Sequence, residues 1–252
     1  MTEREVLDMT EGEVPDMTES QRQREKKELK ITYNNMKRFL TVFASLMIAV
    51  CTSAQDWANF QKYAQANSQV TSKPVAVFMG DSITEGWAKE DPDFFSSNNF
   101  IGRGISGQTT SHMVVRFRRD VLDHNPQYVV ILAGTNDIAR NNGIISLENI
   151  LGNIQSMCEI AMGNGIEPVL CSVLPAAKYP WRPEISNPAP EVIKLNGMLK
   201  EYARNSGIRY VDFHSAMKDQ NDGLPSEYAP DGIHPNIHGF RIMEKMILEE
   251  LR

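Results

Sequence analysis

The stretch Val75-Ala-Val-Phe-Met-Gly-Asp-Ser-Ile-Thr84 passes directly from an unbroken apolar run into small and polar residues. An apolar run without polar alternation is typical of a strand that is covered on both faces, as in a parallel sheet. The glycine at position 80 then marks the strand's carboxyl end. This stretch therefore predicts a buried parallel strand that delivers Asp81 and Ser82 to the edge of a sheet.

The rest of the chain repeats the alternation of apolar runs and helical patterns. Four further runs predict strands, at residues 99–103, 128–133, 168–174 and 208–213. Apolar residues at helical spacing predict helices at residues 146–162, 191–206 and 238–251. Because strands alternate with helices and no linker or repeat interrupts them, we expect one doubly wound, flavodoxin-like α/β domain with a mostly parallel five-stranded sheet.

Composition narrows the class of protein. The 252 residues are 41% apolar and carry a net charge of −6. Both values suit a globular domain with its own core. A nucleic-acid partner is not expected, because the chain has no basic stripe.

The N-terminal residues do not follow the domain pattern. Residues 1–35 are polar and lack apolar periodicity, so we expect a disordered extension, or a translation start that truly lies at Met36. Residues 36–54 have a basic start, a short apolar run and a small residue at the end, as in a secretory signal peptide. We therefore expect a mature domain of residues 55–252 that is periplasmic or secreted, with no membrane span after cleavage.

The cysteines leave alternatives open. Cys51 allows a lipid-anchored form as an alternative, although the preceding Val50 is bulkier than the small residue usual at that position. An uncleaved membrane anchor is a further alternative. Export would permit a disulfide between Cys158 and Cys171. Because one falls on a helix pattern and the other in a strand pattern, two buried thiols are the favoured interpretation.

Four polar or glycine-rich segments follow predicted strands or precede the last helix. They are residues 80–84 (GDSIT), 104–107 (GISG), 134–137 (GTND) and 231–235 (DGIHP). Ligands bind outside the carboxyl ends of the strands in open α/β sheets, so we expect these segments to meet at one edge.

Together these segments hold the groups that acyl transfer requires. The Ser82 hydroxyl needs a base within hydrogen-bond reach, and His234 can be that base, with Asp231 orienting its ring. The backbone N–H groups of Ser82 and Gly104 and the side-chain amide of Asn136 can form an oxyanion hole. The catalytic residues predicted are thus Ser82, Asp231 and His234.

The four segments, in this order, resemble the sequence blocks of the GDSL/SGNH hydrolase family, whose Ser, Gly, Asn and His fall here on Ser82, Gly104, Asn136 and His234. The resemblance spans most of residues 74–240. It implies a three-layer flavodoxin-like fold, no metal or cofactor, and ester hydrolysis through an acyl-enzyme. One departure is Gly102, where many relatives have Asn.

Other interpretations are weaker. Residues 102–107 match G-x-G-x-x-G, but a dinucleotide site would normally place this motif after the first strand. Asp231, His234 and His238 can also be read as metal ligands. A non-catalytic carbohydrate- or nucleotide-binding module is the alternative outside the enzymes, and it is disfavoured because every catalytic part is present.

The substrate is predicted from the resemblance and from the aromatic residues. Relatives with similar starts resemble secreted acetylesterases and platelet-activating-factor acetylhydrolases. Trp87, Tyr179 and Trp181 suggest sugar stacking, and Asp81 is a further candidate contact. We therefore expect a small ester, favouring an O-acetylated saccharide, with a lysophospholipase or thioesterase as the alternative within the class. No feature indicates an oligomeric state.

Overall fold

The computed structural model describes residues 18–53 and 56–252, with only the backbone for residues 42–53. The chain divides into two compact units, residues 1–57 and residues 58–252. Each unit is described by itself.

In the described part of the first unit, residues 19–53 form helix α2 (Glu19–Ser53). It differs from the predicted disorder of residues 1–35, of which residues 1–17 lie outside the described part. The helix forms because residues 19–53 contain neither Gly nor Pro and are rich in Glu, Lys, Arg and Leu, which favour helices. Within the described residues, no helix is long and apolar enough to cross a membrane. The signal peptide stays a prediction, and its cleavage site after Ala54 lies outside the described residues.

The second unit is built on a five-stranded sheet in which every neighbouring pair of strands is parallel. The strands are β1 (Ala76–Gly80), β2 (Phe100–Gly104), β3 (Tyr128–Leu132), β4 (Glu167–Cys171) and β5 (Arg209–Val211). Their order across the sheet is β2-β1-β3-β4-β5. The predicted α/β fold is confirmed, and the sheet is wholly rather than mostly parallel.

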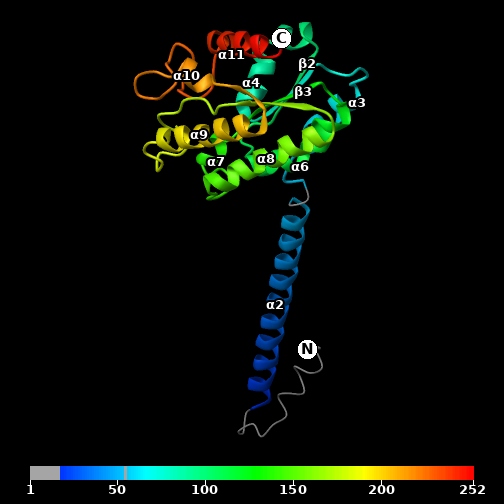
Figure 1. The fold of residues 1–252 in the computed structure, drawn as a ribbon. Coiled ribbons are helices and arrows are strands. Elements are labelled where there is room, and N and C mark those ends of the chain that lie inside the picture. The colour runs from blue at the N-terminus through cyan, green and yellow to red at the C-terminus, as the bar shows by residue number, and fades with distance from the viewer. Residues whose placement is uncertain (1–17, 54–55) are drawn as a thin grey trace. The chain divides into compact units, whose positions relative to one another are not determined.

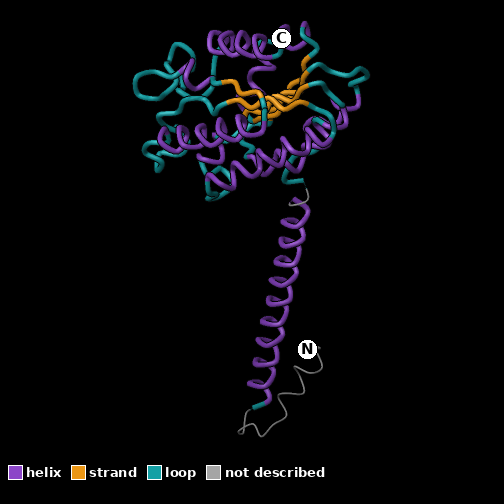
Figure 2. Tube along the Cα trace, in the orientation of Figure 1, coloured by secondary structure: helices purple, strands orange, loops and turns teal. Residues whose placement is uncertain are grey.

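Helices cover both faces of this sheet, which gives the predicted three layers (Figures 1 and 2). They are α3 (Gln61–Ser68), α4 (Ser82–Glu90), α5 (Pro92–Ser97), α6 (Thr110–Asp120), η1 (Leu122–His124), α7 (Thr135–Ile138), α8 (Leu147–Gly163), α9 (Ala189–Ser206), α10 (Phe213–Met217) and α11 (Ile237–Glu250). One apolar core joins the sheet to α6, α8 and α9, and a second joins it to α4, α5, α10 and α11.

Alternate residues of each strand serve the two cores. In β1, Val77 and Met79 belong to the first core, whereas Ala76 and Phe78 belong to the second. All of them are at most 1% exposed. The continuous apolar run is therefore explained by burial on both faces.

Cys158 and Cys171 are free and buried, as predicted. Cys158 lies in the first core and Cys171 in the second, so the sheet separates them. Burial raises the pKa of both thiols, with Cys158 at about 12. Neither side chain is placed to react.

Candidate active site

The turn after β1 places Ser82 at the first position of α4. Asp81 caps this helix, and its Oδ1 accepts the backbone N–H of Ile83 at 3.0 Å. The strand can turn this tightly because Gly80 has no Cβ: a Cβ there would lie 2.1 Å from Thr84 Oγ1. The turn that caps α4 through Asp81 therefore also positions the predicted nucleophile, Ser82, at the start of the helix.

Ser82 and His234 meet although 152 residues separate them. Ser82 Oγ lies 2.9 Å from His234 Nε2, and His234 Nδ1 lies 2.7 Å from Asp231 Oδ2. Ser82 is half-buried, whereas the side chains of His234 and Asp231 are 42% and 45% exposed. The arrangement has the geometry of a nucleophile, a base and an orienting acid, and it is open to solvent.

Asp231 is oriented by hydrogen bonds to both of its carboxylate oxygens. Its Oδ1 accepts the backbone N–H groups of Ile233 at 2.9 Å and His234 at 2.8 Å, around Gly232 at φ +81°. Partial burial raises the pKa of Asp231, but the hydrogen bonds from His234 and from these backbone groups outweigh it and lower the pKa overall. Asp231 is therefore an ionised acceptor for the imidazole N–H.

Gly104 ends β2 against the turn that carries Ser82. A Cβ at Gly104 would lie 2.2 Å from the backbone nitrogen of Glu85 and 2.5 Å from the carbonyl oxygen of Asp81. Only glycine permits this approach. The structure thus brings the end of β2 and the start of α4 into direct contact, as the predicted oxyanion hole requires.

Asn136 lies in α7, and its side chain is buried and oriented at both ends. Its Oδ1 accepts Asn141 Nδ2 at 2.7 Å, and its Nδ2 donates to the carbonyl oxygen of Gln108 at 3.1 Å. Because the oxygen is bound to an amide donor, the NH₂ group faces the loop that follows Gly104. An amide N–H remains for a ligand, since the NH₂ group has two.

Two buried charged residues connect these segments: Arg116, which sequence reasoning missed, and Asp137 of the GTND segment, to which it gave no role. Arg116 of α6 is fully buried, donates to the carbonyl oxygens of Gly80 at 2.9 Å and Arg103 at 2.8 Å, and pairs with Asp120 at 2.8 Å. It therefore connects the ends of β1 and β2 just before Ser82 and Gly104. No motif singles it out, because its sequence context is that of an ordinary polar helix position.

Asp137, the second buried residue, connects α7 to α6. Its carboxylate accepts the Thr110 hydroxyl at 2.6 Å and the Thr110 backbone N–H at 3.0 Å. Burial raises the pKa of Asp137 to about 6, against the lowering effect of these bonds. The acidic residue after Asn136 thus has a structural role.

The predicted substrate contacts require correction. Trp87 is 1% exposed and stacks between Phe94 and Phe240 in the core, and Tyr179 is also 1% exposed, with its hydroxyl bound to Thr135 Oγ1 at 3.2 Å. Asp81 is likewise 1% exposed and serves as the helix cap. These three side chains belong to the core or cap a helix, and none offers an exposed surface for stacking a sugar.

Trp181 is different, because the residue is 38% exposed. The ring lies 6.2 Å from the His234 ring and 5.3 Å from the Tyr179 ring, measured between centroids. Its Nε1 donates to Asn141 Oδ1 at 3.0 Å. Trp181 is thus a fixed, solvent-facing aromatic beside the predicted base.

The alternative that Asp231, His234 and His238 bind a metal ion finds no support among the described residues. His238 is exposed at the start of α11, where its backbone N–H donates to Asn236 Oδ1 at 2.9 Å. Among residues 18–53 and 56–252, no group of three or more His, Cys, Asp or Glu side chains is arranged to hold a metal ion.

The sheet order and the helices on both of its faces define the chain as an α/β protein of the flavodoxin-like, three-layer type. Residues 78–242 match the model of the GDSL-like lipase/acylhydrolase family. The chain belongs to this family, and with it to the carboxylic ester hydrolases.

Individual relatives agree with the family. A GDSL-like lipase from Bacteroides thetaiotaomicron VPI-5482 superimposes with a TM-score of 0.75 at 43% identity, over 78% of this chain and 98% of that one. An acetylxylan esterase from Geobacillus stearothermophilus is 22% identical over 160 residues, which are 60% of this chain and 71% of the relative. The uncharacterized lipoprotein YqeF of Bacillus subtilis (strain 168) is 35% identical over 80 residues, so the match spans only 33% of that relative and 31% of this chain.

Proposed function

We propose that the protein is a serine esterase that hydrolyses small acyl esters, in particular acetyl esters of carbohydrates, through Ser82, His234 and Asp231. The observation that carries the proposal is the unbroken contact from Ser82 Oγ to His234 Nε2 at 2.9 Å and from His234 Nδ1 to Asp231 Oδ2 at 2.7 Å. A serine with a base and an orienting acid at these distances is equipped for nucleophilic catalysis.

In the first half-reaction, His234 takes the proton of Ser82 Oγ while that oxygen attacks the ester carbonyl carbon. The carbonyl electron pair moves to the oxygen, which becomes the oxyanion. The proposed donors to it are the N–H of Ser82, the N–H of Gly104 and the amide of Asn136. The Ser82 N–H suits this role because the first N–H groups of a helix have no partner within the helix and favour negative charge.

The tetrahedral intermediate then collapses, the bond to the alcohol oxygen breaks, and His234 protonates the leaving alcohol. In the second half-reaction, a water molecule gives its proton to His234 and attacks the acyl-enzyme. Collapse releases the acid and returns the proton to Ser82 Oγ. Asp231, with its lowered pKa, stabilises the imidazolium form of His234 in both halves.

Two features support an acetylated saccharide as the substrate. The acetylxylan esterase of Geobacillus stearothermophilus is a relative by sequence. Trp181 presents a partly exposed ring beside His234, the residue proposed to protonate the leaving alcohol. Aromatic rings of this kind provide a large contact area for a sugar face.

The decisive experiment compares Ser82→Ala with Ser156→Ala, a control whose hydroxyl only donates to the carbonyl oxygen of Gly152 in α8. With p-nitrophenyl acetate, Ser82→Ala should lose turnover and Ser156→Ala should keep the parent rate. A fluorophosphonate probe should label the parent at Ser82, as judged by peptide mass. Retained turnover in Ser82→Ala would overturn the proposal.

A second measurement identifies the substrate. Rates on p-nitrophenyl esters of increasing acyl length and on acetylated xylan fragments separate the candidates. A preference for acetyl and release of acetate from xylan support the proposal. A preference for long acyl chains or acyl thioesters would indicate the lysophospholipase or thioesterase alternative.

We further propose that the protein is exported through residues 36–54. The similarity to YqeF, which is described as a lipoprotein, favours testing lipid attachment at Cys51 as well. Mass spectrometry of the N-terminus from a fractionated bacterial host distinguishes the two forms. A mature chain beginning at Gln55 indicates simple cleavage, a diacylated Cys51 indicates a lipid anchor, and residues 1–35 on the exported protein would contradict both.

A further inference from the structure

Helix α3 contacts the residues around Gly104, although it lies before residues 78–242, the part of the chain that matches the family model. The hydroxyl of Tyr63 donates a hydrogen bond to the carbonyl oxygen of Gly104. Burial, with a further contribution from Glu85, raises the pKa of Tyr63 to about 12, so the hydroxyl keeps its proton. Helix α3 therefore binds the peptide group that directly follows the predicted oxyanion donor.

A second connection runs through Glu85 of α4 and reaches Ser106, two residues after Gly104. Glu85 Oε2 accepts the backbone N–H of Ser106 at 2.8 Å. Glu85 Oε1 accepts Lys62 Nζ of α3 at 2.8 Å and Lys89 Nζ of α4 at 2.6 Å. A buried carboxylate thus joins the loop after Gly104 to a lysine of α3.

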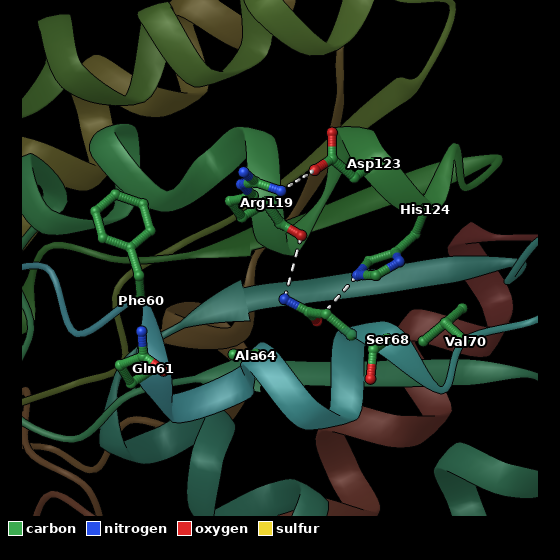
Figure 3. Close-up of a pocket in the computed structure, with 9 residues that line it drawn as sticks. Phe60, Gln61, Ala64, Ser68, Val70, Arg119, Asp123 and His124 are labelled. Carbon is green, nitrogen blue, oxygen red and sulfur yellow. Dashed lines mark hydrogen bonds and ion pairs between the residues drawn. The ribbon is translucent and has the colours of Figure 1, made fainter.

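The far end of α3 is anchored by Asn67. Its Oδ1 accepts Arg103 Nε at 2.7 Å and His124 Nε2 at 3.0 Å, and its Nδ2 donates to Asp120 Oδ1 at 2.8 Å and to the carbonyl oxygen of Arg119. Figure 3 shows this region, where α3 and the end of α6 line a hollow of about 650 Å³. Asn67 thus connects α3 to β2 through Arg103, to the end of α6 through Arg119 and Asp120, and to η1 through His124.

We propose that α3 is a clamp for the oxyanion loop, residues 104–108, and that Tyr63 and Lys62 are positioning residues for catalysis. This inference rests on the proposed function, since it assumes that the N–H of Gly104 serves the oxyanion.

Three consecutive peptide groups show how the clamp works. The carbonyl oxygen of Arg103, in the same peptide group as the Gly104 N–H, is held by Arg116 at 2.8 Å. The next peptide is held by Tyr63 at its oxygen and by the carbonyl oxygen of Gly80 at its nitrogen, 3.2 Å away. The third is held at the Ser106 N–H by Glu85.

The oxyanion hole works only if its donors are aligned before the reaction. A peptide that rotates freely on either side of Gly104 would misalign its N–H. Loss of the Tyr63 hydroxyl should therefore reduce stabilisation of the transition state while leaving ground-state binding intact, because Tyr63 itself touches no substrate.

The test is Tyr63→Phe, which removes one hydroxyl and keeps the ring. With p-nitrophenyl acetate, kcat should fall about three- to tenfold with little change in KM, which is less than the about 10²–10³ lost with a direct oxyanion donor. Labelling by a fluorophosphonate should slow by the same factor, because its adduct also places an oxygen in the hole.

The matched control is Tyr210→Phe, because the Tyr210 hydroxyl also donates to a backbone carbonyl oxygen, that of Asn196 at 3.3 Å, away from the oxyanion loop. It should keep the parent kcat even if it lowers the melting temperature as much as Tyr63→Phe does. If both variants lose stability alike and both keep kcat, α3 only stabilises the fold and the inference is wrong.

A second pair of variants keeps the inference testable if Tyr63→Phe does not fold. Lys62→Met cuts the link from α3 to Glu85, whereas Lys89→Met removes an equivalent ion pair within α4. Lys62→Met should lower kcat more than Lys89→Met, and equal effects would contradict the clamp.

Ser82→Ala is measured alongside to separate the clamp from the proposed function. If Ser82→Ala stays active, the proposed function fails. If Ser82→Ala is inactive and Tyr63→Phe keeps the parent kcat, only the clamp is refuted.

Discussion

The ring of Trp181 lies 6.2 Å from the ring of His234, inclined to it by 32°. The indole Nε1 donates to Asn141 Oδ1, and Asn141 Nδ2 in turn donates to Asn136 Oδ1. One chain of hydrogen bonds thus runs from an exposed aromatic beside the predicted base to the amide predicted to bind the oxyanion. The two ends of this chain can be tested separately.

At the exposed end, Trp181→Ala should weaken binding of an ester with a sugar alcohol more than binding of p-nitrophenyl acetate. Loss of a partly exposed ring contact corresponds to about 1–2 kcal/mol, or a roughly five- to thirtyfold higher KM for the saccharide ester. Trp181→Phe keeps a ring but loses the N–H, so it should retain most of the binding. An unchanged KM for the saccharide ester in Trp181→Ala would show that the ring is not a sugar platform.

At the buried end, Asn141→Ala should lower kcat by roughly tenfold, because the Asn136 amide would lose the donor that fixes its orientation. Asn136→Ala should cost about 10²–10³, as expected for a direct oxyanion donor. Asn142→Ala is the control, since this neighbour is exposed on the same loop. Equal rates in Asn141→Ala and Asn142→Ala, measured with p-nitrophenyl acetate, would show that Asn141 does not orient Asn136 for catalysis.

The sheet and the convergence of the polar segments could be predicted because they depend on local patterns. Continuous apolar runs such as Val129 to Leu132 are buried on both faces, and polar residues after parallel strands must meet at one edge. Ser82, Gly104 and Asn136 follow predicted strands, so this pattern places them at one edge, whereas the assignment of His234 also needed the resemblance to the family's sequence blocks.

The substrate contacts could not be predicted in this way, because an aromatic side chain suits a core as well as a binding surface. Trp87 lies on α4, whose position against Phe78 and Phe240 buries it, and nothing in its local sequence distinguishes it from the exposed Trp181. Arg116 was missed for the converse reason: a helix arginine is ordinarily exposed, and only the packed fold shows that it connects the carboxyl ends of β1 and β2.

Asp231→Asn should reduce kcat about 10²–10⁴-fold with little change in fold. The asparagine can still accept the N–H of Ile233 and His234 through its oxygen, but its NH₂ group would face His234 Nδ1 and favour the tautomer that cannot accept the Ser82 proton. The rate on p-nitrophenyl acetate and the circular dichroism spectrum check both parts. A variant with parental kcat would exclude Asp231 as the orienting acid.

The charge of Glu85 should be visible in the pH dependence of stability. Burial raises the pKa of Glu85, but Lys62, Lys89 and the Ser106 N–H outweigh this effect and lower it to about 2, below the ordinary 4.5. A carboxylate with a lowered folded-state pKa stabilises the fold above pH 4.5, and this contribution is lost as the pH falls from 4.5 towards 2. Glu85→Gln should therefore destabilise the protein at pH 7 by on the order of 1–3 kcal/mol.

The measurement is urea denaturation of the parent and Glu85→Gln at pH 7, 4 and 2.5, with Glu90→Gln, an exposed residue at the end of the same helix, as control. The difference between parent and Glu85→Gln should shrink steadily below pH 4.5, because the parent's carboxyl becomes neutral as well. Glu90→Gln should differ little from the parent at any pH. A difference for Glu85→Gln that stays constant across this range would mean that shape, rather than charge, holds Glu85 between α3 and the Ser106 backbone.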